Sequence, residues 1–250
     1  MAGLPGAAGS ASLVEEHFPN AKWLLDVSDY YLPLAPTWVE FKARLSRNIR
    51  ESLRKCHNAP ERDGISISHT VVQDVSDVAE AIDRFLYLHQ ARSELSGTIR
   101  HNDVFATEST RHFLVDVCQR FAARGALRIF QLSIAKQVVA TRIGFIMGDS
   151  LYLYYSGYDP AYAKYSVMTT VVAEAIRWAI GEGLQTVNLS TGKDASKQRW
   201  GPEHIVYRNA LVVSPSLRGK ITHHTYSTVR RSLESIPIAA QLRALFSRRS

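Results

Sequence analysis

The sequence contains few cysteines and no spacing typical of a metal site. Its 250 residues include only Cys56 and Cys118, which form no C-x-x-C pair and cannot build a disulfide framework of the secreted type. The nine histidines match neither H-E-x-x-H nor a zinc-finger spacing, so we predict no metal. A reducing cytoplasm is the expected location.

Long apolar runs are also absent. No stretch reaches the roughly 18 apolar residues that a membrane-spanning helix needs, so no transmembrane segment is predicted. Residues 1–12 lack the basic start and apolar core of a signal peptide.

Positive charge is in excess. Lys and Arg number 30 against 23 Asp and Glu, for a formal net charge of +7. The excess favours a polyanionic partner, which could be nucleic acid, an acidic membrane surface or a phosphorylated cofactor. The basic segment from Lys42 to Lys55 could hold such a polyanion, or it could be the solvated face of a helix.

Hydrophobic periodicity predicts a mixture of helices and strands. Apolar spacings of three and four predict helices over residues 36–57, 74–92, 108–123 and 166–180. Residues 58–60 are expected to end the first of these helices. In the third, Phe113, Val117 and Phe121 are expected to face inward and Gly125 to terminate the helix. Apolar alternation and short apolar runs predict strands over residues 65–71, 127–134, 138–147, 151–155, 184–189 and 205–213. Three strands in succession predict an antiparallel meander, and the later strand–helix–strand order predicts a parallel pair. The fold class is therefore α/β in an α+β layout, a mixed sheet flanked by helices.

Residues 151–201 are the most informative stretch. A strand runs into a loop and a helix start, and the next strand ends in a polar loop. A helix start gathers unpaired backbone N–H groups, which suit a phosphate-bearing ligand. The candidate cofactor contacts at this start are Val167, Met168, Thr169 and Thr170; an ordinary helix start capped by Ser166 is the alternative.

Three polar residues are the catalytic candidates. Asp194 and Lys197 could orient a substrate hydroxyl or amine, or stabilise charge on an attacked carbonyl. They could equally form a rim salt bridge. Asp159 precedes a proline and could act as a base or simply shape a turn.

Five residues from three segments of the chain are the candidate substrate contacts: Asn48, Arg50, Tyr154, Ser156 and Arg199. Strand alternation predicts that Tyr154 shares a face with Tyr152 while Tyr155 lies on the other. His89 and His101 could serve as acid–base groups, but His89 falls on the apolar side of its helix and is expected to be a core histidine.

Ordered motifs run through the same region. They are Ser46-x-Asn48-x-Arg50, Ser156-Gly-Tyr-Asp159, and Gly192-x-Asp194-x-x-Lys197-x-x-Trp200-Gly201. With these motifs, residues 32–201 resemble the GNAT-type acyltransferases of bacterial exopolysaccharide and cellulose biosynthesis (CelD-like), which are related to the Fem aminoacyltransferases. The resemblance implies a GNAT-like fold, acetyl-CoA or another acyl-CoA as co-substrate, and a functional role for Lys197. The acceptor would be an amine or hydroxyl of a polysaccharide or cell-envelope precursor.

The chain departs from this family in two ways. Members usually carry glycine in the loop that opens the central helix, where this chain has Val167 and Met168, and the larger side chain would narrow the approach of a pyrophosphate. Members also usually have an additional N-terminal subdomain. We therefore expect residues 1–31 to be a flexible leader or a remnant of that subdomain, residues 32–214 the acyltransferase domain, and residues 215–250 a basic, partly helical tail. A second GNAT-like subdomain or a homodimer partner could complete the protein.

Two other functions remain open. One is aminoacyl transfer from a charged transfer RNA, as in Fem-type relatives, which the positive charge favours. The other is a non-catalytic, GNAT-like binding module.

Overall fold

The computed structural model describes residues 4–5, 8–19, 21–24, 26–95, 102–212 and 216. The chain divides into two compact units. The larger unit comprises residues 28–205, and the smaller comprises residues 1–27 and 206–250. The expected tail of residues 215–250 lies outside the described residues, apart from Ser216, as does His101.

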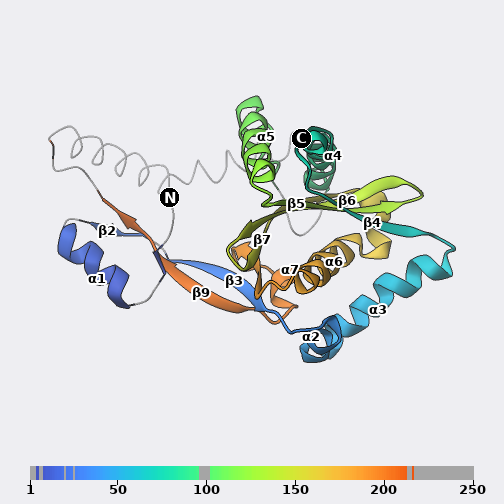
Figure 1. Ribbon diagram of the computed structural model, residues 1–250, viewed down its shortest axis with the longest axis horizontal. Helices are drawn as coiled ribbons and strands as arrows, with labels where there is room; N and C mark the ends of the chain where they lie inside the picture. The colour runs from blue at the N-terminus through green and yellow to red at the C-terminus, as the bar shows by residue number, and fades with distance from the viewer. Residues whose placement is uncertain are drawn as a thin grey trace, which may run out of the picture. The chain divides into compact units, whose positions relative to one another are not determined.

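A mixed sheet forms the centre of the larger unit (Figure 1). Its strands follow the order β9-β3-β8-β7-β6-β5-β4. Their bounds are β3 (Val27–Pro33), β4 (Ile67–Val72), β5 (Leu127–Ile134), β6 (Gln137–Met147), β7 (Ser150–Tyr158), β8 (Thr186–Thr191) and β9 (Glu203–Arg208). The pairs β4–β5, β5–β6, β6–β7 and β3–β8 are antiparallel, and β7–β8 is parallel. The predicted meander and parallel pair are confirmed.

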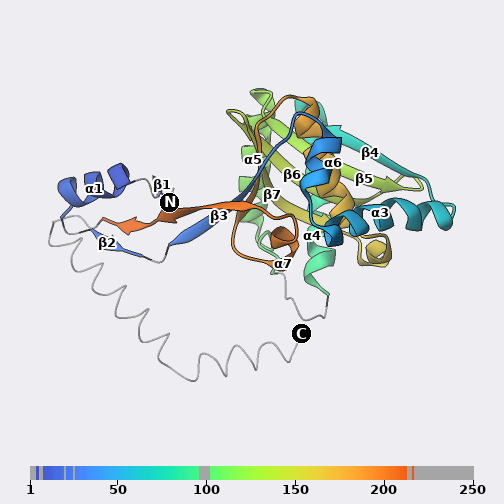
Figure 2. The same ribbon diagram turned by 90° about the horizontal axis from the view of Figure 1, so that it is seen from below.

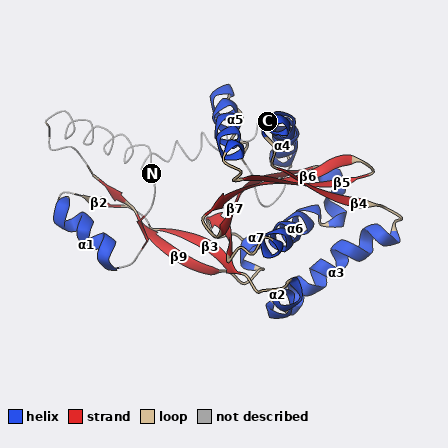
Figure 3. Ribbon diagram, viewed as in Figure 1, coloured by secondary structure: helices blue, strands red, loops and turns tan. Residues whose placement is uncertain are grey.

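Helices cover both faces of this sheet (Figure 3). One face carries α4 (Val75–Ser93) and α5 (Glu108–Ala123), and the other carries α2 (Trp38–Arg44), α3 (Arg47–Arg62) and α6 (Val167–Gly181). Figure 2 shows the unit from the side of α2, α3 and α6. Separate apolar clusters fill the two interfaces: Ile82, Phe85 and Leu114 pack against one face, and Ile49, Val171 and Ile176 against the other.

The basic segment forms two helices rather than the single predicted one. The break lies at Leu45 and Ser46, where the Ser46 hydroxyl accepts the Ile49 amide at 3.5 Å and starts α3. The prediction that residues 58–60 end the helix is wrong, since α3 runs to Arg62 with Pro60 inside its last turn. Pro60 costs α3 one backbone hydrogen bond near its end, and its own carbonyl still accepts the Ile65 amide at 2.8 Å.

Helix α5 has the predicted bounds but a different buried face. Phe113, which we expected inward, is 64% exposed, while Leu114, Cys118 and Ala122 are buried. The apolar stripe is thus shifted by one residue. Gly125 follows the helix at φ +67° and donates to the Ala122 carbonyl at 2.8 Å, so the predicted terminating glycine is confirmed.

Residues 27–31 differ from the expected leader, because they form the first part of β3. This strand pairs with β8 through Asp29–Thr191 and Tyr31–Asn188. The expected leader, residues 1–31, also contains the helix α1 (Ala8–His17), which belongs to the smaller unit. There β1 (Leu4–Pro5) pairs with the end of β9, and β2 (Lys22–Trp23) pairs with β10 (Ala210–Leu211). Within the described parts of the chain, no helix is both long and apolar enough to span a bilayer.

Both thiols are expected to be unreactive in the folded protein. Cys118 is fully buried and Cys56 is 5% exposed. Burial raises the pKa of Cys118 to about 12 and also raises that of Cys56, so neither forms the reactive thiolate at pH 8. Titration with a chromogenic disulfide should detect almost no thiol until denaturant is added and two per chain afterwards. Rapid modification without denaturant would contradict this burial.

Candidate active site

Strands β7 and β8 separate soon after they begin. They pair only from Ser150 to Tyr152 and from Thr186 to Asn188. Beyond these residues the two strand edges no longer bond to each other. We call the opening between the later parts of β7 and β8 the splay.

A bulge lies in β7 where the splay begins. Leu153 pairs with Gly144 and Ser156 pairs with Arg142, so three steps along β7 match two along β6. Tyr154 and Tyr155 therefore oppose the single residue Ile143. A bulge of this kind leaves a residue outside the ladder and bends its strand.

The bulge overturns one prediction about the tyrosines. Tyr154 and Tyr155 do not lie on opposite faces, since both pack against the α4–α5 cluster with ring centroids 4.4 Å apart. The extra residue breaks the two-residue alternation on which the prediction rested. Tyr154 thus lies against the core on the α4 side.

Strand β8 also carries a bulge at the splay. Between the pairs Asp29–Thr191 and Tyr31–Asn188, three steps along β8 match two along β3. Ser190 lies in this bulge at φ +68°, a strained value for a residue with a side chain. The Asn188 side-chain oxygen stabilises it by accepting the Ser190 amide at 2.7 Å. Both edges of the splay are therefore bent.

Lys197 holds the bent end of β8 in place. It lies in the short helix α7 (Ala195–Gln198), and its ammonium donates to the Ser190 hydroxyl at 3.2 Å and to the carbonyls of Thr191 and Gly192 at 2.5 and 3.1 Å. Burial lowers the pKa of Lys197, the Arg142 charge adds to this, and Asp194 opposes it. All three donors of the ammonium have oxygen partners, which indicates a positioning role.

Asp194 and Asp159 cap helical turns. Asp194 begins α7 and accepts the Lys197 amide at 3.1 Å and the Ser196 hydroxyl at 2.5 Å. Burial alone would raise its pKa, but these hydrogen bonds and the Lys197 charge lower it overall. Asp159 accepts the Ala161 amide at 2.9 Å and begins the 3₁₀ turn Pro160–Tyr165.

Exchange of Asp194 is expected to separate capping from acid–base chemistry. Asp194→Asn keeps an oxygen that can cap α7, so turnover and stability should change little. Asp194→Ala loses the cap and should lower the free energy of unfolding by about 1 kcal/mol. Denaturant unfolding and a pH–rate profile of both variants are the measurements. A large loss of turnover in the Asn variant would instead identify the carboxylate as catalytic.

Two further cations reach the splay, and the sequence-based candidates did not include them. Arg92, from the end of α4, donates to the Ser156 hydroxyl at 2.8 Å. Arg142 lies in β6 directly opposite Ser156. Burial and the neighbouring Arg92 lower the pKa of Arg142 to about 10, so it remains charged at neutral pH. The sequence could have indicated Arg142, because it is a charged residue in the middle of an apolar strand, and such residues are rarely buried without a partner.

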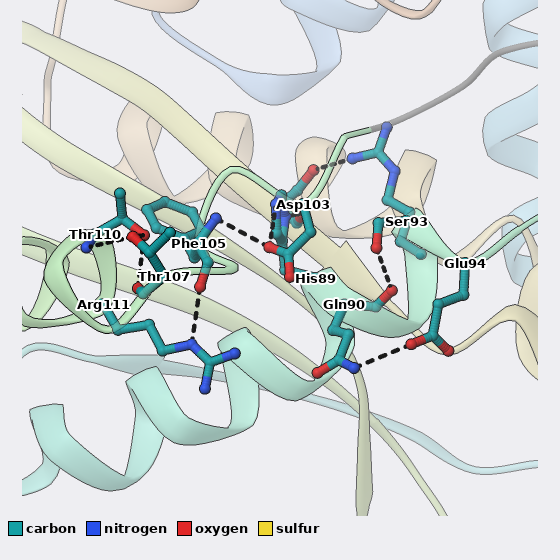
Figure 4. Close-up of polar contacts among 11 residues, drawn as sticks. His89, Gln90, Ser93, Glu94, Asp103, Phe105, Thr107, Thr110 and Arg111 are labelled. Atoms are coloured by element: carbon teal, nitrogen blue, oxygen red, sulfur yellow. Dashed lines mark hydrogen bonds and ion pairs between the residues drawn. The ribbon is translucent and has the colours of Figure 1, made fainter. Parts of the chain in front are cut away.

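The end of α4 packs closely on β7 beyond the bulge. His89 is 5% exposed, and its Nδ1 lies 3.0 Å from the Ser156 carbonyl oxygen. Its Nε2 lies 3.8 Å from Oδ1 of Asp103, a residue of the segment that follows α4 (Figure 4). The expected burial of His89 is confirmed, and this histidine also links α4 to the strand at the splay. Phe85, Phe105 and Tyr155 surround its ring.

The start of α6 is connected to α3. The Thr169 hydroxyl accepts from Arg199 at 3.4 Å, and the same guanidinium donates to Ser52 of α3 at 2.5 Å. The Thr170 hydroxyl donates to the Ser166 carbonyl at 3.4 Å. Val167 is buried, and Met168 is partly buried against two apolar clusters. Only the backbone of these last two residues is therefore suited to contact a ligand.

Asn48 and Arg50 do not join the residues at the splay. Asn48 is exposed, and Arg50 lines a separate cavity of about 1020 Å³ between α3, α6 and β4. Neither Lys197, Asp194 nor Asp159 lines that cavity. The structure thus brings Lys197 and Asp194 together at the splay and leaves the two candidates from α3 elsewhere.

Solved structures share this fold at low sequence identity. A conserved protein of unknown function from Bacteroides thetaiotaomicron is 11% identical with a TM-score of 0.59, and the match covers 82% of this chain and 67% of that one. FemX is 10% identical with a TM-score of 0.56, covering 83% and 70%. L-PGS from Bacillus licheniformis is 13% identical with a TM-score of 0.52, covering 86% and 68%. At these identities the likeness concerns the fold.

The sequence itself also matches a known domain. No curated protein matches it significantly. Residues 44–198, however, match the acetyltransferase (GNAT) domain, and this region contains α3 to α7 together with the splay. The chain belongs to the GNAT acetyltransferase domain family, and its fold is that of a GNAT-like acyltransferase.

Proposed function

We propose that the protein transfers an acyl group from acyl-CoA, in the first instance acetyl-CoA, to an amine or hydroxyl of a saccharide or other cell-envelope precursor. An exopolysaccharide precursor is the acceptor that the sequence motifs favour. The cytoplasm, where acyl-CoA and free thiols occur together, is the proposed location. The acceptor would attack the thioester directly, because the two cysteines lie in α3 and α5 rather than at the splay.

The observation that carries this proposal is the splay with its bulged edges. A bulge leaves backbone groups outside the ladder, and an unpaired amide there can donate to the oxygen of a thioester carbonyl. Arg92 and Arg142 add positive charge beside the same strand segment. The unpaired amide and the two guanidinium groups would together stabilise the negative charge that develops on the attacked carbonyl.

The start of α6 supports phosphate binding. The first amides of a helix have no intrahelical partner and carry partial positive charge. Arg199 lies at this start through its contact with Thr169. Met168 packs its side chain into the apolar clusters, so a pyrophosphate would meet the backbone and the Arg199 guanidinium.

Isothermal titration with acetyl-CoA tests the donor. We expect saturable binding that Arg199→Met weakens about tenfold, the loss expected for one charge-assisted contact. Arg124→Met, which removes an exposed charge at the end of α5, is the matched control and should bind normally. Absence of binding at millimolar concentration would reject acyl-CoA as the donor.

Aminoacyl transfer from a charged transfer RNA is the second candidate. Lys42, Arg47 and Arg50 line the α3 cavity, and no ion pair within the described residues engages them. Such a row of exposed cations suits a phosphate backbone. Affinity for transfer RNA that falls steeply with salt and weakens in Arg47→Met would favour this donor. Equally weak binding of transfer RNA by the wild type and by Arg47→Met would exclude this donor.

A further inference from the structure

Arg142 differs from the other cations at the splay because it has no polar partner. Within the described residues its guanidinium makes no hydrogen bond and no ion pair, and its Nε is out of contact with solvent. Arg92 bonds to Ser156, and Lys197 bonds to four oxygen atoms around the end of β8. Arg142 is only partly exposed, and a partly buried charge without a protein partner is costly, so proteins rarely retain one without a use.

Neighbouring carboxylates compensate this charge only in part, since the Asp194 charge favours the charged form of Arg142 without forming an ion pair with it. Asp194 is engaged by the Ser196 hydroxyl, the Lys197 amide and the Lys197 ammonium. Asp29, on β3, accepts the side-chain amide of Asn188 with Oδ2 at 2.7 Å, and its buried Oδ1 makes no hydrogen bond, to Arg142 or to any other described residue. Arg92 adds a like charge close enough to disfavour the charged form of Arg142. Positive charge is therefore concentrated where β7 has left β8.

Arg128, a second arginine in the same sheet, has the contacts expected of an arginine with a structural role. Arg128 of β5 donates to the carbonyls of Gly125 and Leu127 at 2.8 and 2.6 Å. Its guanidinium also stacks over the Trp178 ring at 4.9 Å. Arg142 has neither carbonyl partners nor an aromatic platform of this kind among the described residues, so the fold does not use its hydrogen-bonding capacity.

We propose that Arg142, with Arg92 beside it, binds a carboxylate or phosphate group of the substrate that occupies the splay. A guanidinium presents paired donors that match either group in a two-point contact. This inference rests on the proposed acyl transfer for its location and adds the chemical class of the substrate, which is anionic near the reacting centre. The anion belongs either to the acyl group of the donor or to the acceptor.

Thermal unfolding of the full chain tests the anion site without an activity assay. At constant ionic strength, sodium phosphate or sodium succinate should raise the unfolding midpoint of the wild type. Arg142→Met should abolish that rise, and its midpoint without anions should equal or exceed that of the wild type. The control Arg124→Met, which removes an exposed charge, should respond to the anions like the wild type.

Three outcomes would overturn the proposal. They are an unchanged wild-type midpoint in both anions, an equal rise in Arg142→Met, and an Arg142→Met chain that is markedly less stable or unfolded. The last would show that the guanidinium supports the fold. Arg142→Lys provides a second reading, because it keeps the charge but loses the planar fork, and it should respond to the anions less than the wild type.

Titration with two acyl-CoA molecules of equal length identifies the source of the anion. Succinyl-CoA ends in a carboxylate where butyryl-CoA ends in a methyl group. Tighter binding of succinyl-CoA by about tenfold or more, lost in Arg142→Met, assigns the anion to the acyl donor. Equal binding of both assigns it to the acceptor. If neither acyl-CoA binds while the anions still stabilise the wild type through Arg142, the proposed donor fails and the anion site stands.

Discussion

Gly157→Ala is expected to lower the free energy of unfolding by about 3 kcal/mol or more, near the upper end for overpacking. A Cβ at this position would lie 2.5 Å from the backbone nitrogen of His89 and 2.6 Å from the carbonyl carbon of Leu88. Both are backbone atoms of α4, so no side-chain rotation can relieve the clash. Helix α4 would have to move away from β7. Denaturant unfolding measures the loss.

Gly181→Ala is the matched control. Gly181 ends α6, and an added Cβ there meets no atom within 4 Å. Alanine at this helical position should raise stability by up to about 1 kcal/mol, because glycine loses more backbone freedom on folding. A small effect of Gly157→Ala, comparable to this control, would contradict the close contact between α4 and β7. Because His89, Arg92 and Ser156 lie at that contact, Gly157→Ala should also weaken ligand binding at the splay.

Lys197→Ala is expected to reduce turnover about 100-fold while leaving a folded protein. The ammonium fixes the bent end of β8, and a displacement of about 1 Å at a reacting centre can produce a loss of this size. Removing the ammonium also leaves carbonyls without their donor, so stability should fall by about 2 kcal/mol. Steady-state kinetics with acetyl-CoA, together with denaturant unfolding, measure both effects.

The pH dependence of turnover separates positioning from proton transfer. A positioning lysine contributes no pKa of its own to the pH–rate profile, so the profile of Lys197→Ala should keep its shape at lower amplitude. Lys197→Arg, which retains a cation with several donors, should recover part of the activity. Disappearance of one limb of the profile in Lys197→Ala would instead place the amine in the chemistry. Unchanged turnover would remove Lys197 from the site altogether.

The sequence predicted the order of elements better than the direction of side chains. The helices, the meander and the parallel pair follow from apolar periodicity, which is local along the chain. Strand β3 was missed because its place in the sheet depends on pairing with β8, more than 150 residues later. The buried face of α5 was shifted by one residue, since Phe113 and Leu114 fit a helical stripe equally well in the sequence.

The candidate site was predicted in part. Lys197 and Asp194 lie at the splay as a local pair, which their spacing of three residues already indicated. Arg92 and Arg142 come from α4 and β6 and meet there only because β7 is bulged and β8 has turned away. Asn48 and Arg50 were grouped with the site by the family motif, yet they belong to a helix over a different part of the sheet.

Because of the bulge at Tyr154 and Tyr155, residues 154–157 are expected to evolve together. Loss of either tyrosine could be absorbed in two ways. If the later part of the strand kept its pairing with β6, the ladder would become regular and Gly157 would still face α4. If that part slipped by one residue instead, a side chain would enter the space that only Gly157 can occupy. A change in strand length is therefore tolerated here only where the flanking pairs are kept. Among descendants of this sequence, the length of the bulge and the position of the glycine should be inherited as one unit.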